Sequence, residues 1–244
     1  MAGMNRPAEL SVVIPCLNEA TRLPLLLADL QHGGLRLEIL LADGGSSDAT
    51  VRIAHLTGSQ LINVQEPGRG RQLRAAAAQA QTDWLLFLHA DSRLSAQWSG
   101  VLSTLLQHSS TERSAWYFDL QISPSTPARR LLEGVVGLRS RMLQRPYGDQ
   151  GLFLHRNLYE HCGGFAELPL MEDLDLVERL GRVADLRRIG LPLTTDGRRW
   201  QEEGVLRRSW RNARLRRRWK QGESPERLAA DYYGTQFAYQ KPQR

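Results

Sequence analysis

The chain has 244 residues, of which 41% are hydrophobic and 24% charged, values that are ordinary for a globular protein and suit one large α/β domain. No stretch reaches the ~18 apolar residues that a membrane-spanning helix needs, and the first residues lack the apolar segment of a secretory signal. The two cysteines, Cys16 and Cys162, have no metal-ligand spacing and form no disulfide framework. We therefore expect a cytoplasmic protein with reduced thiols.

The formal net charge is +6, but one segment carries the excess of basic residues. Residues 198–220 contain ten Lys/Arg and two Glu, whereas the rest of the chain has 22 basic and 24 acidic residues. This distribution argues against a fold that binds nucleic acid as a whole, so we expect no nucleic-acid partner. It favours a local surface that faces an anion or a membrane.

Apolar runs alternate with helical patterns over the first ninety residues. The patterns predict strands over 10–15, 37–42, 61–64 and 84–88. They also predict a helix that Asn18 caps and that runs to Gln31, a second that begins at Ser47 or Asp48, and a third over 71–81. This alternation implies a parallel sheet with right-handed crossovers.

Beyond residue 90 the pattern is less regular. We expect strands over 116–122, 151–154 and 186–189, and helices over 94–107, 128–143, 156–162, 173–183 and 206–219, with another beginning at Ser224-Pro225. No repeat or linker divides the chain. We therefore interpret residues 1–244 as a single domain, with a basic helical segment at about 203–236.

Acidic residues stand at the ends of several predicted elements: Asn18-Glu19, Asp43, Asp91 and Glu172-Asp173. The carboxyl ends of parallel strands meet in one crevice, which is where open α/β sheets bind ligands. A crevice lined with acids that also holds a nucleotide implies a metal ion.

The motifs IPCLNE, ADGGSSDAT and LHAD, in this order, resemble the family 2 glycosyltransferases, which share the GT-A fold. The likeness is greatest to a small bacterial subfamily with an LHAD metal motif, and it extends from about Ser11 to Trp200. It implies a Rossmann-like αβα sandwich with a mostly parallel central sheet. It also implies an inverting, metal-dependent transfer of a sugar from a nucleoside-diphosphate sugar to an acceptor hydroxyl.

The resemblance assigns the nucleotide-sugar site to residues at the strand ends. Asp43 would accept a hydrogen bond from the base, and small residues after it let the backbone approach the ligand. The expected binding residues are Pro15, Asn18, Glu19, Asp43, Gly45, Ser46, Ala90 and Asp91. Asp48 has an alternative interpretation as the cap of the following helix.

Three arginines are further candidates for the diphosphate. Arg69 and Arg71 lie in PGRGRQ, where the family often has a basic residue, and a solvated loop is the alternative for both. Arg199 resembles a basic residue near the end of these domains, beside Trp200, which could stack on an acceptor. The alternative for Arg199 is an arginine at a helix start, and the alternative for Trp200 is a core residue.

The triplet His89-Ala90-Asp91 takes the place of the family's Asp-x-Asp, with histidine for the first acid. By resemblance, Asp91 meets Mg²⁺ or Mn²⁺, and a hard cation can use one carboxylate together with phosphate oxygens. His89 would ligate the metal, contact the ribose or hold Asp91. A turn is the alternative for a strand-end Asp.

The pair Glu172-Asp173 resembles the family's general base, with Asp173 as the base and Glu172 as its partner. The alternative is that both acids stabilise a helix N-terminus. Asp149 and Gln150 are candidates to bond sugar or acceptor hydroxyls, or to form a plain turn. Gly163-Gly164-Phe165 resembles the family's segment before the acidic pair.

The acceptor is not evident from the sequence. The basic helix could lie on an anionic membrane surface, toward a lipid-linked acceptor, or pair with acids of another subunit. Two other functions stay open: a GT-A-like nucleotidyltransferase, whose glycine- and arginine-rich loop is missing after the first strand, and a non-catalytic basic binding module. No G-x-G-x-x-G follows the first strand, which disfavours nicotinamide chemistry.

Overall fold

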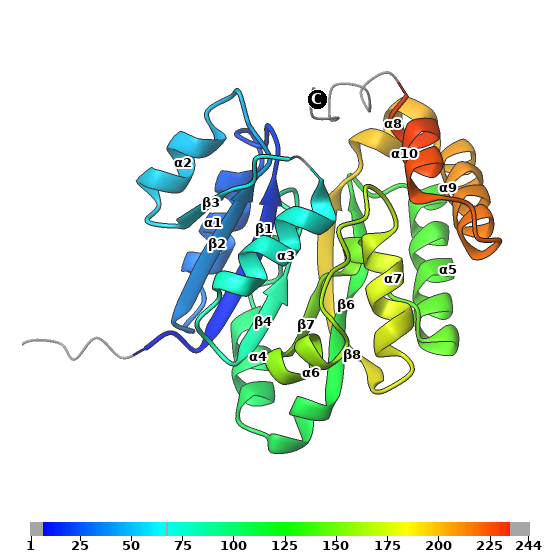
Figure 1. Ribbon diagram of the computed structural model, residues 1–244. Helices are drawn as coiled ribbons and strands as arrows, with labels where there is room; N and C mark the ends of the chain where they lie inside the picture. The colour runs from blue at the N-terminus through cyan, green and yellow to red at the C-terminus, as the bar shows by residue number, and fades with distance from the viewer. Residues whose placement is uncertain (1–6, 67, 235–244) are drawn as a thin grey trace, which may run out of the picture.

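A computed structural model describes residues 7–66 and 68–234, and all of their side chains except those of Ser109 and Arg199. Among these residues one sheet of eight strands runs through the centre, in the order β3-β2-β1-β4-β7-β6-β8-β5 (Figure 1). The strands in chain order are β1 (Leu10–Cys16), β2 (Leu37–Asp43), β3 (Gln60–Asn63), β4 (Trp84–Phe87), β5 (Arg93–Leu94), β6 (Ser114–Ser123), β7 (Leu152–His155) and β8 (Asp185–Asp196).

The first half of the sheet is parallel, as the alternating pattern predicts. Strand β1 pairs in parallel with β2 and β4, and β2 with β3. The connections are helices α1 (Leu23–Gln31), α2 (Thr50–Leu56) and α3 (Arg69–Gln79). Because Cys16 pairs with Asp43, strands β1 and β2 end level with each other, and the loops that follow them open on the same edge.

Helices cover both faces of the sheet, which confirms the expected αβα sandwich. Side chains alternate along β1: Val13 packs with α3 and α7 (Glu172–Leu180), whereas Val12 and Ile14 pack with α1 and α4 (Trp98–Leu106). Strand β4 is buried along its whole length, which explains its unbroken apolar sequence. The core therefore has two apolar layers with the sheet between them.

The second half of the sheet contains the antiparallel pairs. Strand β7 runs antiparallel to β4 and β6, β8 runs parallel to β6, and β5 joins the edge antiparallel to β8. Strand β8 continues to Asp196, well past the predicted 186–189. Gly190 and Pro192 interrupt its sequence pattern, but the strand still pairs with β6 as far as Ser123 opposite Asp196.

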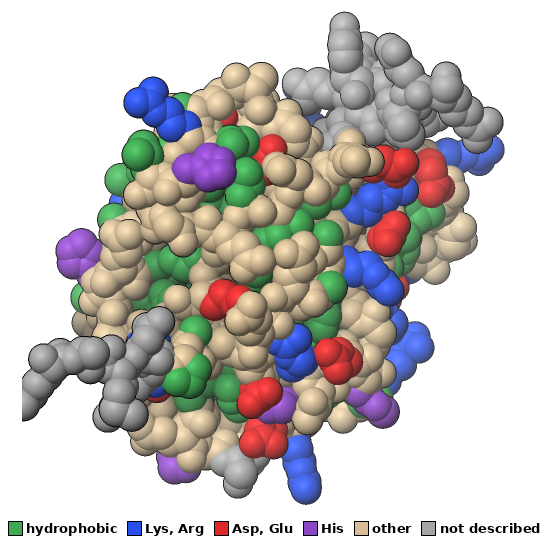
Figure 2. Space-filling view, turned by 60° about the vertical axis from the view of Figure 1, so that its left-hand side comes forward, with side chains coloured by type: hydrophobic (Ala, Val, Ile, Leu, Met, Phe, Trp, Pro, Cys, Tyr) green, Lys and Arg blue, Asp and Glu red, His purple; other side chains and the backbone are tan. Residues whose placement is uncertain are grey.

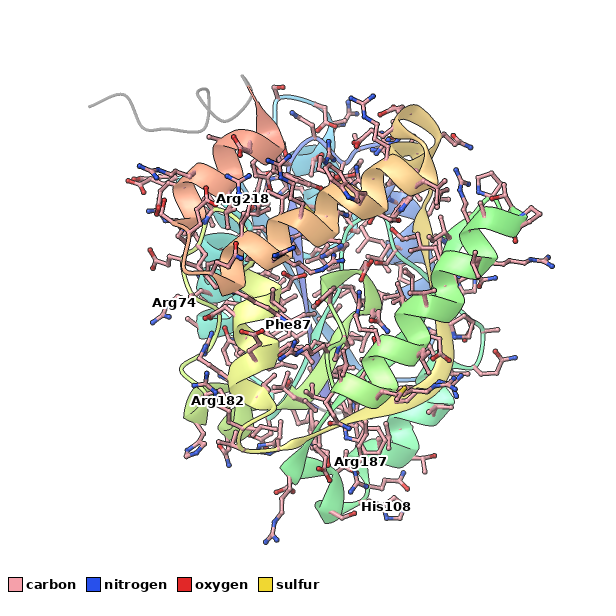
Figure 3. The ribbon with its side chains drawn as sticks, turned by 90° about the vertical axis from the view of Figure 1, so that its right-hand side faces the viewer. Arg74, Phe87, His108, Arg182, Arg187 and Arg218 are labelled. Carbon is pink, nitrogen blue, oxygen red and sulfur yellow. The ribbon has the colours of Figure 1, made fainter. Side chains whose placement is uncertain are left out.

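Four helices pack at the far end of the sheet: α5 (Pro127–Leu143), α8 (Arg198–Glu203), α9 (Val205–Lys220) and α10 (Pro225–Tyr233). Leu215 of α9 and Leu228 of α10 are buried together against Leu170. Arg218 joins the two helices, because it bonds to Glu223 and lies 2.6 Å from Asp231. Figure 3 shows α5 and α9 on the same side of the molecule.

The basic segment predicted at 203–236 is thus a helical hairpin, and its last two positions lie outside the described residues. On the face displayed in Figure 2, the described charged side chains of both signs are scattered over the surface. No helix among residues 7–66 and 68–234 is long and apolar enough to cross a membrane.

Several predicted boundaries are wrong. Helix α1 begins at Leu23, with Pro in its first turn, and Asn18 does not cap it. Asn18 has a φ of +56° and accepts a bond from the backbone N–H of Ser47 instead. Helix α4 begins at Trp98 rather than at 94, because Arg93 and Leu94 form the edge strand β5.

Candidate functional site

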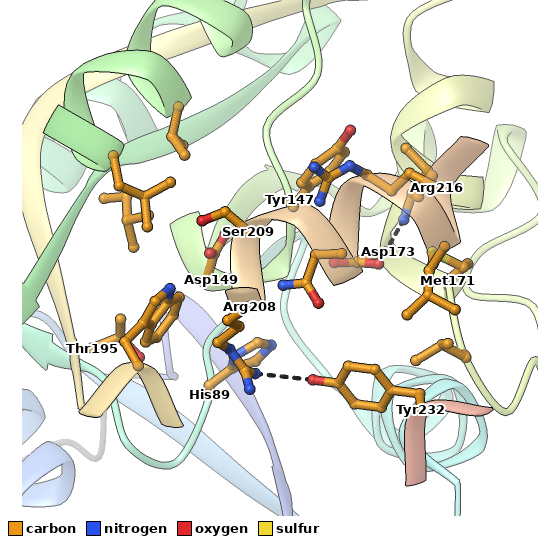
Figure 4. Close-up of a pocket in the computed structure, with 18 of the residues that line it drawn as sticks. His89, Tyr147, Asp149, Met171, Asp173, Thr195, Arg208, Ser209, Arg216 and Tyr232 are labelled. Carbon is orange, nitrogen blue, oxygen red and sulfur yellow. Dashed lines mark hydrogen bonds between the residues drawn. The ribbon is translucent and has the colours of Figure 1, made fainter. Parts of the chain in front are cut away.

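A cavity of about 220 Å³ opens between the end of β4, the end of β8 and the helices α5, α7, α9 and α10 (Figure 4). The expected site residues Arg69, His89, Asp91 and Asp173 line it. These polar residues therefore converge on one cavity, although Arg69 and Asp173 lie more than a hundred residues apart in the sequence.

His89 and Asp91 follow directly after β4. Ser92 donates a backbone bond to the carbonyl of His89 at 3.1 Å, so this segment forms a turn. Asp91 accepts a bond from the hydroxyl of Thr195 on β8 at 3.3 Å. The turn that was the alternative interpretation of Asp91 therefore also aims its carboxylate into the cavity. Ala90, between the two, is buried.

The donor set suits a hard divalent cation that keeps other oxygen ligands, because it offers one carboxylate and one imidazole. Among the described residues, no group of three or more His, Cys, Asp or Glu side chains has an arrangement that could hold a metal ion. Any metal here would need further ligands from water or from a bound phosphate.

Asp173 lies in the first turn of α7, beside His89. Its Oδ2 accepts a bond from the N–H of Gly148 at 2.8 Å, and its Oδ1 from the N–H of Leu174 at 2.8 Å. Burial alone would raise the pKa of this carboxyl, but attraction to Arg69 and the two N–H bonds hold it below the ordinary value. Asp173 is thus kept ionised inside the cavity.

Glu172 has different surroundings from its neighbour. Its side chain is 1% exposed and forms an ion pair with Arg69. Burial raises the pKa of Glu172, and Arg69 opposes that rise. Glu172 therefore does not line the cavity. It pairs with the guanidinium of Arg69, and Arg69 does line the cavity.

The two arginines that the sequence could not separate lie in different places. Arg69 lines the cavity, and the nearby carboxylates of Glu172 and Asp173 raise its pKa despite its burial. Arg71 pairs with Glu66 and Glu167 at the surface. The side chain of Arg199, the third predicted phosphate-binding arginine, lies outside the described part of the structure.

The predicted nucleoside residues form a pair of loops at the ends of β1 and β2. Asn18 donates its N–H to the hydroxyl of Ser46 at 2.9 Å, and Glu19 donates its N–H to the hydroxyl of Thr50 at 2.9 Å. Asp48 accepts bonds from the N–H groups of Thr50 and Ala20, which tie the two loops together, but it is not the cap of α2, whose N-cap position is Ala49.

Asp43 lies at the centre of these loops and is buried. Its Oδ2 accepts bonds from Gly45 at 3.0 Å and Ser46 at 2.9 Å, whereas its buried Oδ1 has no partner among the described residues. Gly45 has a φ of +92°, which a residue with a side chain rarely adopts. The loop therefore presents one carboxylate oxygen that still needs a donor.

A chain of polar contacts links the loops to the cavity, although the loop residues do not line it. Arg22 pairs with Glu19 at 3.2 Å and with Asp196 at 3.0 Å. Asp196 and its neighbour Thr195 stand at the end of β8 and line the cavity. Pro15, half-buried near the end of β1, lies on the same edge of the sheet.

The loop before β7 also contributes to the site. Tyr147 and Asp149 line the cavity, and burial raises the pKa of Asp149. Gln150 is buried and bonds to Ser140 and to the carbonyl of Phe118, so it does not reach the cavity. The expectation that Gln150 could bond a substrate hydroxyl is therefore wrong.

Sequence reasoning missed the cavity residues of the C-terminal half. Arg139 of α5, Arg208 and Arg216 of α9 and Tyr232 of α10 all line the cavity. Trp200, predicted as either an acceptor platform or a core residue, lines it and also packs against Leu120 and Val136. The only signal in the sequence was the density of arginines, which does not indicate which of them face inward.

Comparison with known proteins identifies the chain. Residues 11–112 match the model of the glycosyl transferase family 2. Over this segment the chain is similar to that family. The match covers the strand ends that carry Asn18, Asp43 and Asp91, so the resemblance drawn from the motifs is confirmed at the level of the family.

A curated relative of this chain is the 4,4'-diaponeurosporenoate glycosyltransferase of Staphylococcus haemolyticus, which is 34% identical over 92 residues. That alignment covers 35% of this chain and 24% of the relative. The chain thus spans about a quarter of the length of that relative.

Solved structures confirm the GT-A fold. S. aureus TarS superposes with a TM-score of 0.64 at 15% identity, covering 95% of this chain and 72% of that one. Glucosyl-3-phosphoglycerate synthase from Mycobacterium tuberculosis, crystallised with Mn²⁺, UDP and glucosyl-3-phosphoglycerate, superposes with a TM-score of 0.56 at 18% identity. That superposition covers 77% of this chain and 72% of the synthase.

Proposed function

We propose that this family 2 glycosyltransferase is an inverting enzyme that transfers a sugar from a nucleoside-diphosphate sugar to an acceptor hydroxyl. The observation that carries the proposal is the convergence of His89, Asp91 and Asp173 on one cavity, at the sheet edge where the nucleoside loops also lie. The M. tuberculosis synthase, which has a similar fold, was crystallised with Mn²⁺ and UDP, and this supports a nucleotide-sugar donor for the present protein.

The nucleoside would lie against the loops after β1 and β2. The unpartnered Oδ1 of Asp43 is a buried acceptor, and the N–H of a uracil or a similar base would satisfy it. Pro15, Asn18, Glu19, Gly45 and Ser46 would frame the base and ribose. Arg22 pairs with Glu19 in the nucleoside loops and with Asp196 at the cavity, so these ion pairs would lie between the ribose and the diphosphate.

Asp91 and His89 would hold a divalent cation, Mg²⁺ or Mn²⁺, together with phosphate oxygens. Such a cation supplies positive charge that stabilises the departing nucleoside diphosphate. Arg69 lines the same cavity and would add its own charge at the diphosphate, with Glu172 fixing its position. In this assignment Glu172 is a positioning residue, and Ala90 contributes backbone only.

Asp173 would act as the general base. It accepts the proton from the acceptor hydroxyl as that oxygen bonds to the anomeric carbon. The bond from this carbon to the diphosphate oxygen breaks, and its electron pair leaves with the nucleoside diphosphate. Attack opposite to the leaving group inverts the anomeric centre, and no covalent sugar intermediate is needed.

The family match disfavours the nucleotidyltransferase alternative, and the loop after β1 supports the same choice. A non-catalytic binding module would not explain why the Asp173 carboxylate lines the cavity with its pKa held below the ordinary value. We also propose that residues 1–244 act as one GT-A domain with the α9–α10 hairpin as its last part.

Turnover of a panel of nucleoside-diphosphate sugars with Mg²⁺ or Mn²⁺ tests the function. We expect release of nucleoside diphosphate, with Asp173→Asn lowering kcat by about 10²- to 10⁴-fold and Asp119→Asn, a surface carboxylate paired with Arg188, leaving it unchanged. Release of pyrophosphate from a nucleoside triphosphate, or full activity in Asp173→Asn, would overturn the proposal. Retention of the anomeric configuration would overturn the single displacement.

We further propose that the outer sides of α5 and α9 rest on an anionic membrane. Leu131, Val135, Leu138 and Met142 of α5 are 58–72% exposed and share one helical face, and Leu206 and Trp210 of α9 are 85% and 66% exposed. Exposed arginines of α9, including Arg207, Arg214 and Arg217, flank the apolar side chains. Apolar faces with basic flanks suit anionic lipid headgroups.

Co-sedimentation with vesicles tests this contact. We expect binding to vesicles that contain phosphatidylglycerol, weakened by salt, and little binding to phosphatidylcholine alone. The double substitution Leu206→Ser and Trp210→Ser should reduce binding, whereas Leu56→Ser on α2, at a residue that is 75% exposed, should not. Equal binding of all three proteins to both kinds of vesicle would contradict the contact.

A further inference from the structure

Two arginines flank the ring of Tyr147 on one wall of the cavity. The guanidinium carbon of Arg139, from α5, lies 3.8 Å from the ring centroid, and that of Arg216, from α9, lies 5.3 Å from it. Figure 4 shows Tyr147 and Arg216 together, with Asp173 next to them. Helices that are distant in the sequence thus bring two positive charges to one place.

Neither arginine is neutralised. Within the described residues, Arg139 and Arg216 form no ion pair, whereas Arg69 pairs with Glu172 and Arg208 with Glu203 at 2.7 Å. The Nε of Arg139 donates to the carbonyl of Arg145 at 3.2 Å, and its buried Nη2 has no partner. A buried guanidinium N–H without an acceptor costs free energy. A bound ligand with an acceptor atom at this wall would therefore be stabilising.

The nearest acid on this wall does not supply the missing charge. Asp149 lines the cavity but forms no ion pair with either arginine, and its buried Oδ1 is unpartnered in the described part of the chain. Burial raises the pKa of Asp149, which favours the neutral carboxyl. Burial lowers the pKa of Arg139 and Arg216 adds repulsion, whereas Tyr147, Asp149 and Asp173 attract its guanidinium without forming an ion pair.

The wall lies beside the proposed base. Gly148, the residue after Tyr147, donates its N–H to Oδ2 of Asp173 at 2.8 Å. A group held by the two guanidiniums is therefore close to the atom that would take the acceptor's proton. The wall is separate from the nucleoside loops, because it comes from α5, α9 and the segment before β7.

We infer that Arg139, Tyr147 and Arg216 form a subsite for an anionic group of the acceptor, a phosphate or a carboxylate, which places the acceptor hydroxyl beside Asp173. This inference rests on the proposed glycosyl transfer. Guanidinium forks suit both anions because they donate parallel hydrogen bonds to two oxygens. The ring of Tyr147 contacts both guanidiniums through cation–π interactions, which help to fix their orientation.

Calorimetric titration of inorganic phosphate into the full chain, saturated with UDP and Mg²⁺, tests the subsite. We expect phosphate to bind the wild-type protein and to bind Arg216→Gln and Arg139→Gln roughly tenfold to a hundredfold more weakly. Arg217→Gln is the matched control, because this arginine is the next residue of α9 and is exposed. Arg216→Gln leaves the buried Nη2 of Arg139 and its bond to Arg145 in place, so it tests the subsite if Arg139→Gln does not fold.

Failure of the inference and failure of the proposed function give different results. If UDP itself does not bind, the proposed function fails, and phosphate titration without UDP still tests the arginines. If Arg139→Gln and Arg216→Gln weaken UDP binding as well, the arginines serve the donor diphosphate and the subsite is overturned. Absence of phosphate binding to the wild type, or an equal loss in Arg217→Gln, would also overturn it.

Competition against bound phosphate then identifies the source of the anion. Displacement by glycerol 3-phosphate supports a soluble acceptor, and displacement only by lysophosphatidic acid in phosphatidylcholine vesicles supports a lipid headgroup. Glycerol has the same hydroxyls without the charge, so it should not compete. Displacement by glycerol as strong as by its phosphate would contradict an anion site.

Discussion

Asp173 and Glu172 are adjacent in the sequence, but the fold gives them opposite surroundings. Asp173 faces the cavity with two N–H donors and a depressed pKa, whereas Glu172 is enclosed and bound to Arg69. The acidic motif predicts a base within the pair. The resemblance also predicts Asp173 as the base and Glu172 as its partner, but the contacts of Gly148 and Arg69 that give the two acids different surroundings come from other parts of the chain and could not be predicted.

The pH dependence of kcat should show how Arg69 acts on Asp173. A base must be ionised, and its depressed pKa keeps Asp173 ionised until the pH falls below the usual carboxyl range, about 4. In the double variant Arg69→Met with Glu172→Gln, the attraction is lost and burial remains, so the acid limb of kcat should move up by about one pH unit or more.

The second substitution in that variant avoids leaving Glu172 as an unpaired buried charge. Arg71→Met is the control, because Arg71 lies on the same helix but pairs at the surface with Glu66 and Glu167. The steady-state rate, measured from pH 8 down to about pH 3, should have the same acid limb in Arg71→Met as in the wild type. Identical limbs in all proteins would mean that Asp173 does not titrate as the base.

Some roles of single residues were evident from the sequence and others were not. Strand ends and the LHAD motif indicate Asp43 and Asp91, because the residues after a buried strand point to the ligand edge of the sheet. The cavity arginines Arg139 and Arg216 belong to long basic or mixed helices. Which side of such a helix faces inward is decided by tertiary packing, so the sequence alone does not separate them from exposed arginines.

At the scale of elements, a close approach between α3 and α7 sets the position of Arg69. A Cβ on Gly70 would lie 2.3 Å from the carbonyl oxygen of Ala166 and 3.2 Å from Cβ of Glu172. The start of α3 therefore fits against the start of α7 only without a side chain. This contact brings Arg69 to Glu172.

Replacing Gly70 should separate these two helices. Because Gly70→Ala pushes against backbone, we expect it to lower the free energy of unfolding by about 1–3 kcal/mol and to lower kcat. Gly100→Ala on α4 is the matched control, since nothing lies within 4 Å of its Cβ, and it should stabilise by up to about 1 kcal/mol. Urea unfolding measures both, and equal stability of the two variants would refute the close approach.

Across the whole molecule, predictability falls from the first half to the second. The parallel half repeats a local strand–helix unit, so periodicity and turn residues predict it well. The second half depends on long-range pairing: β7 enters the sheet antiparallel between β4 and β6, and β8 carries the sheet through Gly190 and Pro192. The cavity lies where the two halves meet, and helices from the less predictable half form much of its wall.

The central claim is that the cavity beside Asp91 holds a nucleoside diphosphate through a divalent cation. Calorimetric titration of UDP with and without Mn²⁺, into wild type, Asp91→Ala and Asp173→Asn, tests it most directly. We predict that Mn²⁺ strengthens UDP binding in wild type and in Asp173→Asn, and that Asp91→Ala loses this gain. UDP binding that is unaffected by Mn²⁺ in the wild type, or a full gain in Asp91→Ala, would contradict the claim.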